Sequence, residues 1–217
     1  MGVPLGWNWS PERLNMVIYK HIFNLLSLFY DPLITLLTFF MRGPGYEKHV
    51  RSTILAELDC LPGQRVLEVG VGTGTNLNYI DKSVHITGVD PAGAMLRRCR
   101  KRARMLGIDA VLFCQEAESL PFDNEQFDRV LCVNVLMYSR SPDRIIEEAL
   151  RVLKPGGLFV VAVKQGWFSN NRHLLDTKSE GTAVLKCKQV GSTQITVVRK
   201  IDDQEQHQLA RWMSINF

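Results

Sequence analysis

The stretch that most constrains the fold of this chain is residues 65–75, which read Arg-Val-Leu-Glu-Val-Gly-Val-Gly-Thr-Gly-Thr. Its apolar, β-branched first half predicts a buried strand that carries Glu68 near its end. Gly70, Gly72 and Gly74 follow at alternate positions, where the chain must turn sharply and let another group approach its backbone. A strand that opens through such a loop into a helix offers backbone N–H groups to a nucleotide-like ligand. We therefore expect an α/β fold with a ligand site at this loop.

The spacing of the glycines separates two kinds of nucleotide site. The dinucleotide fingerprint G-x-G-x-x-G, counted from Gly70 and Gly72, requires a third glycine at position 75. The residue there is Thr75, and the chain reads G-x-G-x-G instead. A pyrophosphate-binding loop is therefore disfavoured, and a plain tight turn is the structural alternative to a ligand loop.

Three further segments follow the glycine loop. A second strand-like run ends in Asp90, 18 positions after Gly72. Then come Glu-Ala-Glu-Ser-Leu-Pro-Phe at 116–122 with Phe-Asp-Arg-Val-Leu at 127–131, and Arg-Val-Leu-Lys-Pro-Gly-Gly-Leu at 151–158. Together with the E-x-G-x-G-x-G pattern, these motifs resemble those of the class I S-adenosylmethionine-dependent methyltransferases. Two branches of that family are the most similar: the quinone-biosynthesis C-methyltransferases and the bacterial phospholipid N-methyltransferases.

Strand-like and helix-like patterns alternate along most of the chain. We expect helices at 47–61, from about 75, at 92–106 and at 142–153, and strands at 65–69, 84–89, 110–115, 127–133 and 158–163. Two further strands, 183–190 and 193–200, flank a hairpin turn at Gly191-Ser192. This rhythm indicates a Rossmann-like, mostly parallel sheet with helices on both faces. The resemblance implies seven strands, of which the last is antiparallel.

The predicted organisation has three parts: an N-terminal helical lid at 1–45, an S-adenosylmethionine-binding methyltransferase domain at 46–200, and a C-terminal tail at 201–217. In the lid, an amphipathic helix begins at Ser10-Pro11 and a more apolar one begins at Asp31-Pro32. A charge and a proline in the middle of the apolar stretch disfavour a membrane span. Two alternatives remain for residues 11–41: they cover the core of their own domain, or they contact a membrane surface.

The resemblance also implies a cofactor, S-adenosyl-L-methionine, with S-adenosyl-L-homocysteine as its product. The cofactor-binding residues that it implies are Glu68, Gly70, Gly72, Gly74, Asp90, Glu116, Ala117 and Asn134. It assigns the glycines to the methionine carboxylate and the sugar, Glu68 to the amino group, and Glu116 with Ala117 to the adenine. Glu116 stands where the family more often has Asp. Asp90 ends a strand, in the crevice where open α/β sheets bind ligands, so its carboxylate can accept both ribose hydroxyls. Its structural alternative is to cap a helix that begins at Pro91.

No residue stands out as catalytic, and the candidates are Tyr138, Asn134 and His49. Asn134 ends the fourth strand, where the resembled enzymes place residues that face the transferred methyl group. The N-P-P-Y motif of nucleobase and glutamine methyltransferases is replaced here by Asn-Val-Leu-Met-Tyr, which disfavours a nucleobase substrate. Tyr138 either orients a substrate or packs as an ordinary tyrosine. His49, beside the lid, is a candidate general base.

Charge and cysteine content bear on partners and compartment. The net charge of +4 is mild, and the cationic helix at 92–106 spreads its charges around its circumference without interleaved aromatic residues. No nucleic acid is therefore expected as a partner. Five scattered cysteines without a C-x-x-C pair indicate buried free thiols, a reducing compartment and no metal site. We expect a cytoplasmic location, with peripheral contact at the inner membrane face as the variant.

These observations predict a methyltransferase that acts on a small, apolar or amphipathic acceptor of the lipid or quinone type. The acceptor class is inferred from the apolar segment at 14–41, which precedes the cofactor domain and can close over it. A catalytically weak, membrane-associated binding module is one alternative, and a nucleic-acid methyltransferase is another.

Overall fold

The computed structural model describes residues 40–171 and 181–202, together with the single positions 22, 25, 32, 36, 37, 174 and 205. The predicted lid at 1–45 and the tail at 201–217 therefore lie almost entirely outside the described residues, and the division into three parts stays a prediction. Within the described part, no helix is long and apolar enough to cross a lipid bilayer.

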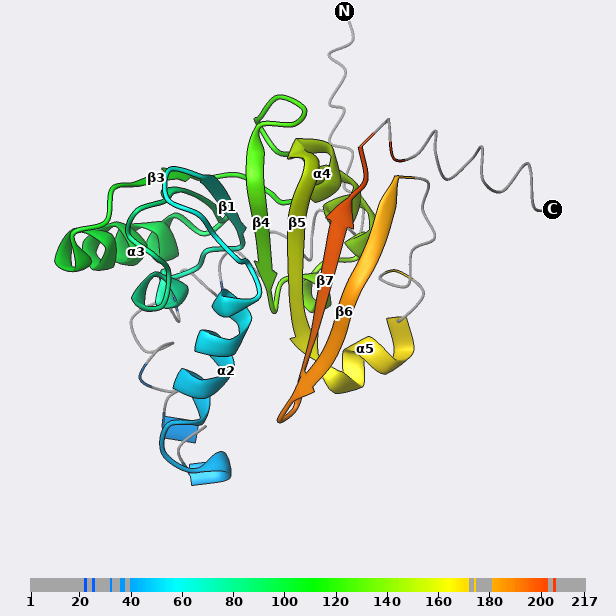
Figure 1. Ribbon diagram of the computed structural model, residues 1–217. Coiled ribbons are helices and arrows are strands. Elements are labelled where there is room, and N and C mark those ends of the chain that lie inside the picture. Colours follow the sequence, from blue (N-terminus) through cyan, green and yellow to red (C-terminus); the bar gives the residue numbers. More distant parts are fainter. Residues whose placement is uncertain are drawn as a thin grey trace, which may run out of the picture.

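The centre of the fold is a seven-stranded sheet with the strand order β3-β2-β1-β4-β5-β7-β6 (Figure 1). Its strands are β1 (Arg65–Val69), β2 (His85–Val89), β3 (Ala110–Phe113), β4 (Phe127–Val133), β5 (Leu153–Lys164), β6 (Thr182–Val190) and β7 (Thr193–Lys200). Strands β1 to β5 pair in parallel, whereas β7 is antiparallel to both of its neighbours. The predicted fold class is confirmed. The order reverses between β1 and β4, and open α/β sheets bind ligands at such a reversal.

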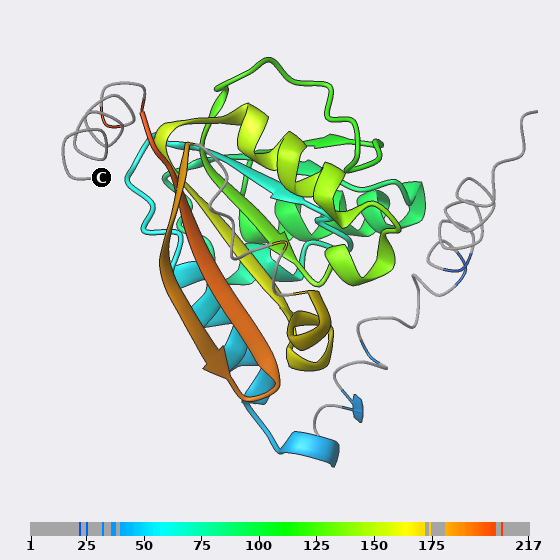
Figure 2. The ribbon, with the colours of Figure 1, turned by 90° about the vertical axis from the view of Figure 1, so that its right-hand side faces the viewer.

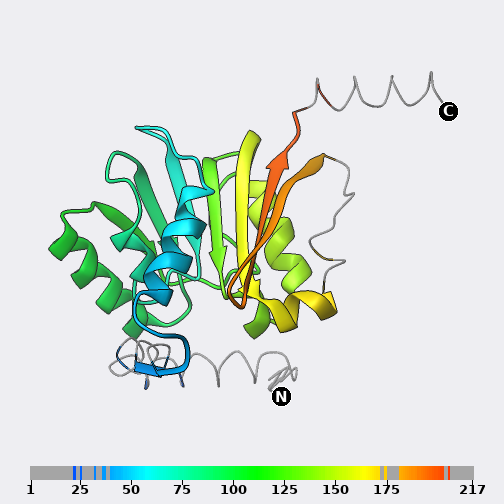
Figure 3. The same ribbon diagram turned by 60° about the horizontal axis from the view of Figure 1, so that its bottom comes forward.

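Helices cover both faces of the sheet, with α2 in front of the strands and α4 behind them (Figures 1 and 3). Helices α2 (Tyr46–Ala56) and α3 (Gly93–Leu106) bury apolar side chains in one core. Helices α4 (Pro142–Val152) and α5 (Gln165–Asn171) do so in the other. The connections that carry α3 and α4 across the sheet are the crossovers that parallel strands require.

Strand side chains alternate between these two cores. Leu67 and Val69 of β1 lie in the core under α4, and Val66 lies in the core under α2 and α3. The central strand β4 repeats the pattern, with Val130 on the α4 side and Leu131 on the other. Successive strand residues point to opposite faces, so a strand covered on both faces must be apolar at nearly every position. The unbroken apolar run of β1 follows from this requirement.

Two elements differ from the sequence prediction near the glycine loop and at β5. The helix expected from about 75 is a single 3₁₀ turn, η1 (Thr75–Asn78), because the Asn76 side chain turns inward onto buried Glu68. Strand β5 begins at Leu153 rather than at 158, since Leu153 pairs with Phe127 ahead of a register shift in β4.

The helix expected at 47–61 ends at Ala56 because the chain then turns sharply toward β1. Asp59 adopts a left-handed backbone conformation with φ of 45°. The Arg129 guanidinium of β4 donates to the backbone oxygens of Leu58 and Asp59, at 2.6 and 2.9 Å. These bonds give hydrogen-bond partners to two carbonyl groups of the turn between α2 and β1, which no strand or helix pairs.

The predicted hairpin at Gly191-Ser192 is confirmed, and it packs against α2 (Figure 2). The Tyr46 hydroxyl, at the start of α2, accepts a hydrogen bond from the Ser192 backbone N–H at 3.0 Å. A Cβ atom added at Gly191 would lie 2.3 Å from the same hydroxyl oxygen. Glycine at the turn therefore allows the hairpin and the helix to meet.

The five cysteines are free thiols, but only two of them are fully buried. Burial raises the pKa of the Cys99 and Cys132 thiols to about 12, so these two are poor nucleophiles at neutral pH. Cys114 and Cys187 are exposed, because one follows β3 and the other lies in β6, the two edge strands of the sheet. The expectation of buried thiols is wrong for these two positions.

Candidate functional site

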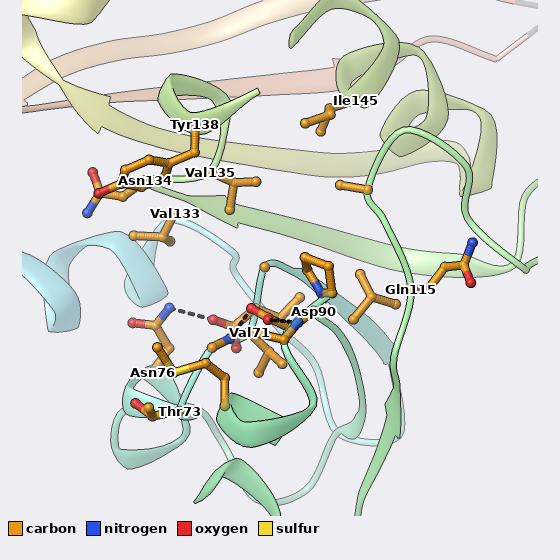
Figure 4. A pocket seen from close by; sticks show the side chains of 18 of the residues that line it. Val71, Thr73, Asn76, Asp90, Gln115, Val133, Asn134, Val135, Tyr138 and Ile145 are labelled. Atoms are coloured by element: carbon orange, nitrogen blue, oxygen red, sulfur yellow. Dashed lines mark hydrogen bonds between the residues drawn. The ribbon is translucent and has the colours of Figure 1, made fainter. Parts of the chain in front are cut away.

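A pocket opens where the carboxyl ends of β1, β2 and β4 meet (Figure 4). Its lining comes from the ends of β1, β2 and β4 and the loops that follow them, from the segment after β3, and from helices α2, α3 and α4. This is the point at which the strand order reverses. The pocket therefore lies where the topology of an open α/β sheet leaves a crevice.

Two of the three loop glycines, Gly70 and Gly72, line the pocket. All three have positive φ, at 70°, 54° and 76°, a conformation that strains any residue with a side chain. The predicted cofactor residue Gly74 is not part of the pocket lining, and a Cβ added there would lie 2.7 Å from the Cys99 sulfur. Its role is the packing of the loop on α3.

The N–H groups of the glycine loop are largely engaged within the protein. Those of Gly70 and Val71 donate to the Val89 carbonyl at 2.8 and 2.9 Å, and that of Gly74 donates to the Val71 carbonyl at 2.9 Å. The Gly72 N–H donates to the Asp90 carboxylate at 3.0 Å. A ligand at this loop therefore contacts the glycine Cα atoms and the backbone carbonyl oxygens of the loop, since most of the N–H groups already donate within the protein.

Asp90 lies on the pocket wall and is held from two sides. Its Oδ2 accepts the Gly72 N–H at 3.0 Å, and its Oδ1 accepts the Ala92 N–H at 2.8 Å. Burial raises the pKa of the Asp90 carboxyl, and these two hydrogen bonds oppose the rise. The predicted alternative of a helix cap is wrong, because α3 begins at Gly93 and Ala92 is its N-cap residue.

Glu68 forms the floor of the pocket and is only 2% exposed. Its Oε1 accepts a hydrogen bond from the Asn76 side-chain amide at 2.6 Å, drawn as a dashed line in Figure 4. Its Oε2 has no hydrogen-bond partner among the described residues. Burial raises the pKa of Glu68 to about 7, although Asn76 and Arg51 lower it. The pKa of this buried acid is therefore raised toward neutral pH, and its Oε2 is left without compensation among the described residues.

The segment after β3 contributes residues next to the predicted ones. Ala117 is buried and lines the pocket, but Glu116 is exposed and lies outside the lining. Its neighbours Gln115 and Glu118 line the pocket instead. Glu118 accepts a hydrogen bond from the Ser139 hydroxyl at 2.6 Å, which joins this segment to the loop after β4. An adenine contact by Glu116 stays a prediction that this placement does not favour.

The candidates for catalysis are divided between the pocket and the surface. Asn134 and Tyr138 lie together on the pocket wall (Figure 4). Asn134 has a φ of 57°, and its side-chain oxygen is buried without a hydrogen-bond partner among the described residues. Tyr138 is 42% exposed at the mouth, on the 3₁₀ turn η2 (Leu136–Tyr138). His49 is exposed on α2 and does not line the pocket.

Sequence reasoning missed two polar residues of this site, Arg51 and Asn76. Arg51 reaches the pocket from α2, a helix that precedes the glycine loop and carries no motif. Asn76 comes two positions after Gly74, inside a turn that was expected to be an ordinary helix. The one usable signal was at Asn76, a polar residue in the first turn after a ligand loop.

Comparison with known proteins agrees with this geometry. Residues 67–161 match the family model described as a methyltransferase domain. Over 105 residues the chain is 41% identical to the phthiotriol/phenolphthiotriol dimycocerosates methyltransferase of Mycobacterium tuberculosis, covering 47% of this chain and 38% of that protein. It is 38% identical over 101 residues to the phosphatidylethanolamine N-methyltransferase of Cereibacter sphaeroides, covering 46% and 50%. It is 34% identical over 119 residues to the demethylmenaquinone methyltransferase of Renibacterium salmoninarum, covering 54% and 48%.

The fold is also that of solved methyltransferases. A S-adenosylmethionine-dependent methyltransferase from Aquifex aeolicus superposes with a TM-score of 0.59 at 19% identity, covering 70% of this chain and 89% of that one. The chain spans half or less of the length of the three curated relatives that it matches. The predicted resemblance is confirmed for residues 67–161, which match a methyltransferase domain model, and the fold of the described residues is that of S-adenosylmethionine-dependent methyltransferases.

Proposed function

We propose that this protein is a S-adenosylmethionine-dependent methyltransferase acting on a small, apolar or amphipathic acceptor of the lipid or quinone type. The observation that carries the proposal is the pairing of two buried acids in one pocket. Asp90 is fixed by two backbone N–H groups, and Glu68 offers an unpaired oxygen at the floor. A nucleoside with an α-amino group requires both a ribose acceptor and an ammonium acceptor.

Different residues of the pocket bind different parts of the cofactor. The Asp90 carboxylate accepts the ribose hydroxyls, Glu68 accepts the amino group, and Ala117 packs against the adenine. When bound, S-adenosylmethionine supplies a methyl group on a positively charged sulfur, which an acceptor atom attacks in line. The protein's part is alignment and the exclusion of water. Asn134 on the pocket wall and Tyr138 at the mouth position the acceptor, and Tyr138 is the candidate to take its proton.

The acceptor class rests on two lines of support. The three relatives are named for phthiotriol and phenolphthiotriol dimycocerosates, for phosphatidylethanolamine and for demethylmenaquinone, and these names support an acceptor of the lipid or quinone type. The described positions before α2 also expose large apolar side chains: Phe40 is 76% exposed and Met41 is 77% exposed. Large apolar side chains that are exposed next to each other in the sequence favour contact with a membrane or another apolar partner. We therefore assign residues 11–41 to peripheral contact with the membrane that holds the acceptor.

One experiment tests activity and membrane contact together. The protein is incubated with methyl-labelled S-adenosylmethionine and vesicles of phosphatidylethanolamine and phosphatidylglycerol, with or without demethylmenaquinone, and the vesicles are then floated. We expect label in the lipid fraction and protein in the floating layer. Replacing Phe40 and Met41 by serine should reduce flotation about tenfold or more, since each buried apolar side chain contributes about 1.5–3 kcal/mol.

The matched control replaces Leu61 and Met105, which are 60% and 78% exposed elsewhere on the surface. This control variant should float as the wild type does. Binding of S-adenosylmethionine without transfer of label to either acceptor would contradict the proposed enzyme and favour a binding module. Equal flotation of both variants would contradict the assignment of residues 11–41.

A pH prediction follows from Glu68. Binding of S-adenosylhomocysteine should tighten roughly tenfold between pH 6 and pH 8, because the ammonium group binds the ionised carboxylate, and the ionised fraction rises through a pKa of about 7. The stability of the ligand-free protein should change in the opposite direction and fall as pH rises. The pKa of Glu68 is raised in the folded protein, so the protonated side chain stabilises the fold fully below about pH 4.5. This contribution to the free energy of unfolding is lost as pH rises through about 7, and it amounts to about 3 kcal/mol.

The variant Glu68→Gln tests whether ionisation of Glu68, rather than of another group, causes both pH dependences. It keeps an oxygen for Asn76 but cannot ionise, so both slopes should flatten. Titration calorimetry gives the affinity and thermal unfolding gives the stability, each across the same pH series. Unchanged slopes in Glu68→Gln would assign the pH dependence to another group.

A further inference from the structure

Arg51 is a cation in the cofactor pocket for which the proposed function has so far given no role. It lies on α2 with its side chain 19% exposed, and it lines the pocket. Its Nη1 donates to the Asn76 side-chain oxygen at 2.6 Å, and its Nε donates to Glu47 at 3.1 Å. The guanidinium is thus fixed in position by two partners, one toward the pocket floor and one toward the surface.

Asn76 joins Arg51 to the buried acid. Its side-chain oxygen accepts from Arg51, and its side-chain nitrogen donates to Glu68, each at 2.6 Å. Arg51 lowers the pKa of Glu68, which places the two charges within electrostatic reach of each other. The floor of the pocket therefore presents a positive and a negative group, separated by one amide. An α-amino acid carries the complementary pair, a carboxylate and an ammonium.

The glycine loop cannot easily supply the carboxylate partner. Four of its N–H groups, at Gly70, Val71, Gly72 and Gly74, already donate to acceptors in the protein. A carboxylate that enters a half-buried pocket loses hydration, and it binds well only where donors of the protein replace the lost water. Arg51 is the cationic side chain on the described lining of this pocket. A guanidinium also suits a carboxylate, because its planar array of N–H groups matches two oxygens.

We infer that Arg51 binds the α-carboxylate of the cofactor's methionine moiety, while Glu68 binds its α-ammonium group. Arg51 thereby determines specificity, since it distinguishes the full cofactor from adenosine derivatives that lack the amino-acid end. The inference rests on the proposed function, because it assigns a residue to one end of the proposed cofactor.

The test uses three ligands that differ only in this end. S-adenosylhomocysteine has both charged groups, S-adenosyl-3-thiopropylamine keeps the amine but lacks the carboxylate, and 5′-methylthioadenosine lacks both. Affinities are measured by titration calorimetry at about pH 8.5, where Glu68 stays ionised. Arg51→Met should weaken binding of S-adenosylhomocysteine on the order of 10- to 100-fold, the effect of one charged hydrogen-bonding partner. Binding of the other two ligands should change less than about twofold.

Two further variants control for charge and folding. Arg51→Lys keeps the charge and should recover part of the affinity for S-adenosylhomocysteine. Arg199→Met removes the same charge at the far end of β7, where Arg199 pairs with Glu205 at 2.7 Å, and it should bind all three ligands as the wild type does. Thermal unfolding of each variant identifies any loss that comes from unfolding alone.

The possible outcomes separate the inference from the function. If Arg51→Met lost affinity for S-adenosylhomocysteine and for S-adenosyl-3-thiopropylamine to the same extent, the carboxylate assignment would be overturned. The proposed cofactor site would still stand. The same holds if the wild type binds those two ligands equally well. A wild-type protein that binds none of the three ligands would overturn the proposed function, and the inference with it.

Discussion

Replacing Asp90 by alanine should weaken binding of S-adenosylhomocysteine about 100-fold or more. The variant loses two charge-assisted hydrogen bonds to the ribose, each worth about 1.5–3 kcal/mol, and tenfold in affinity corresponds to about 1.4 kcal/mol. It also releases the N–H groups of Gly72 and Ala92, which the carboxylate now fixes at 3.0 and 2.8 Å. The loop and the start of α3 thus lose a common acceptor. Titration calorimetry at about pH 8 measures the loss.

A matched control for Asp90 is available in the same sheet. Asp128 also accepts a backbone N–H, that of Arg65 at 2.8 Å, and pairs with Lys154 at 2.7 Å, but it lies outside the pocket lining. Asp128→Ala should lower the unfolding temperature while leaving the affinity within about threefold, since a distant site contributes independently. If folded Asp90→Ala protein bound the ligand as tightly as Asp128→Ala does, the ribose assignment would be wrong.

Replacing Gly70 by alanine should be the most damaging single change in the loop. The new Cβ would lie 2.2 Å from a methyl group of Val135, at a backbone φ of 70°. Left-handed backbone costs an alanine about 1–2 kcal/mol, and overpacking adds about 1–3 kcal/mol. We expect the unfolding temperature to fall by roughly 5–15 °C, given about 2–4 °C per kcal/mol for a chain of this size. Thermal unfolding followed by circular dichroism measures the change.

Two variants separate the backbone strain from the clash. Gly107 ends α3 at a φ of 67° with no atom within 4 Å of an added Cβ, so Gly107→Ala should show the strain alone. Combining Gly70→Ala with Val135→Ala removes the clashing methyl group and should recover part of the lost stability. Losses of the same size in Gly70→Ala and Gly107→Ala would mean that contact with Val135 costs nothing.

The sequence predicted the central sheet well because its signals are local. The apolar run of β1 and the three glycines at its end depend on burial from both faces and on positive φ, and both leave a mark on residue type. The placement of Asp90 in the crevice followed from its position after the end of β2. The structure puts it there, and its contact with the ribose stays a prediction.

The parts that sequence did not predict depend on contacts between distant segments. Arg51 belongs to the pocket only because α2 packs beside the glycine loop, and no spacing rule links it to Glu68. Glu116 was chosen by its place in a motif, but the turn after β3 directs its neighbours Gln115 and Ala117 into the pocket. The helix expected from about 75 was shortened by the bond between Asn76 and Glu68, a side-chain contact that periodicity does not reveal.

The contact between α3 and the glycine loop has a consequence for the entropy of binding. Arg102 donates from Nη1 to the Thr73 backbone oxygen at 2.7 Å and to the Thr75 hydroxyl at 3.2 Å. Because the N–H groups of Gly70, Val71, Gly72 and Gly74 are also engaged within the protein, the loop holds its shape before any ligand arrives. Little conformational freedom remains to be lost when the nucleoside docks, so most of the interaction energy is retained as affinity. Removing the contacts of Arg102 with the loop would leave the methyl-transfer step itself unchanged, but it would increase the dissociation rate of every bound nucleoside.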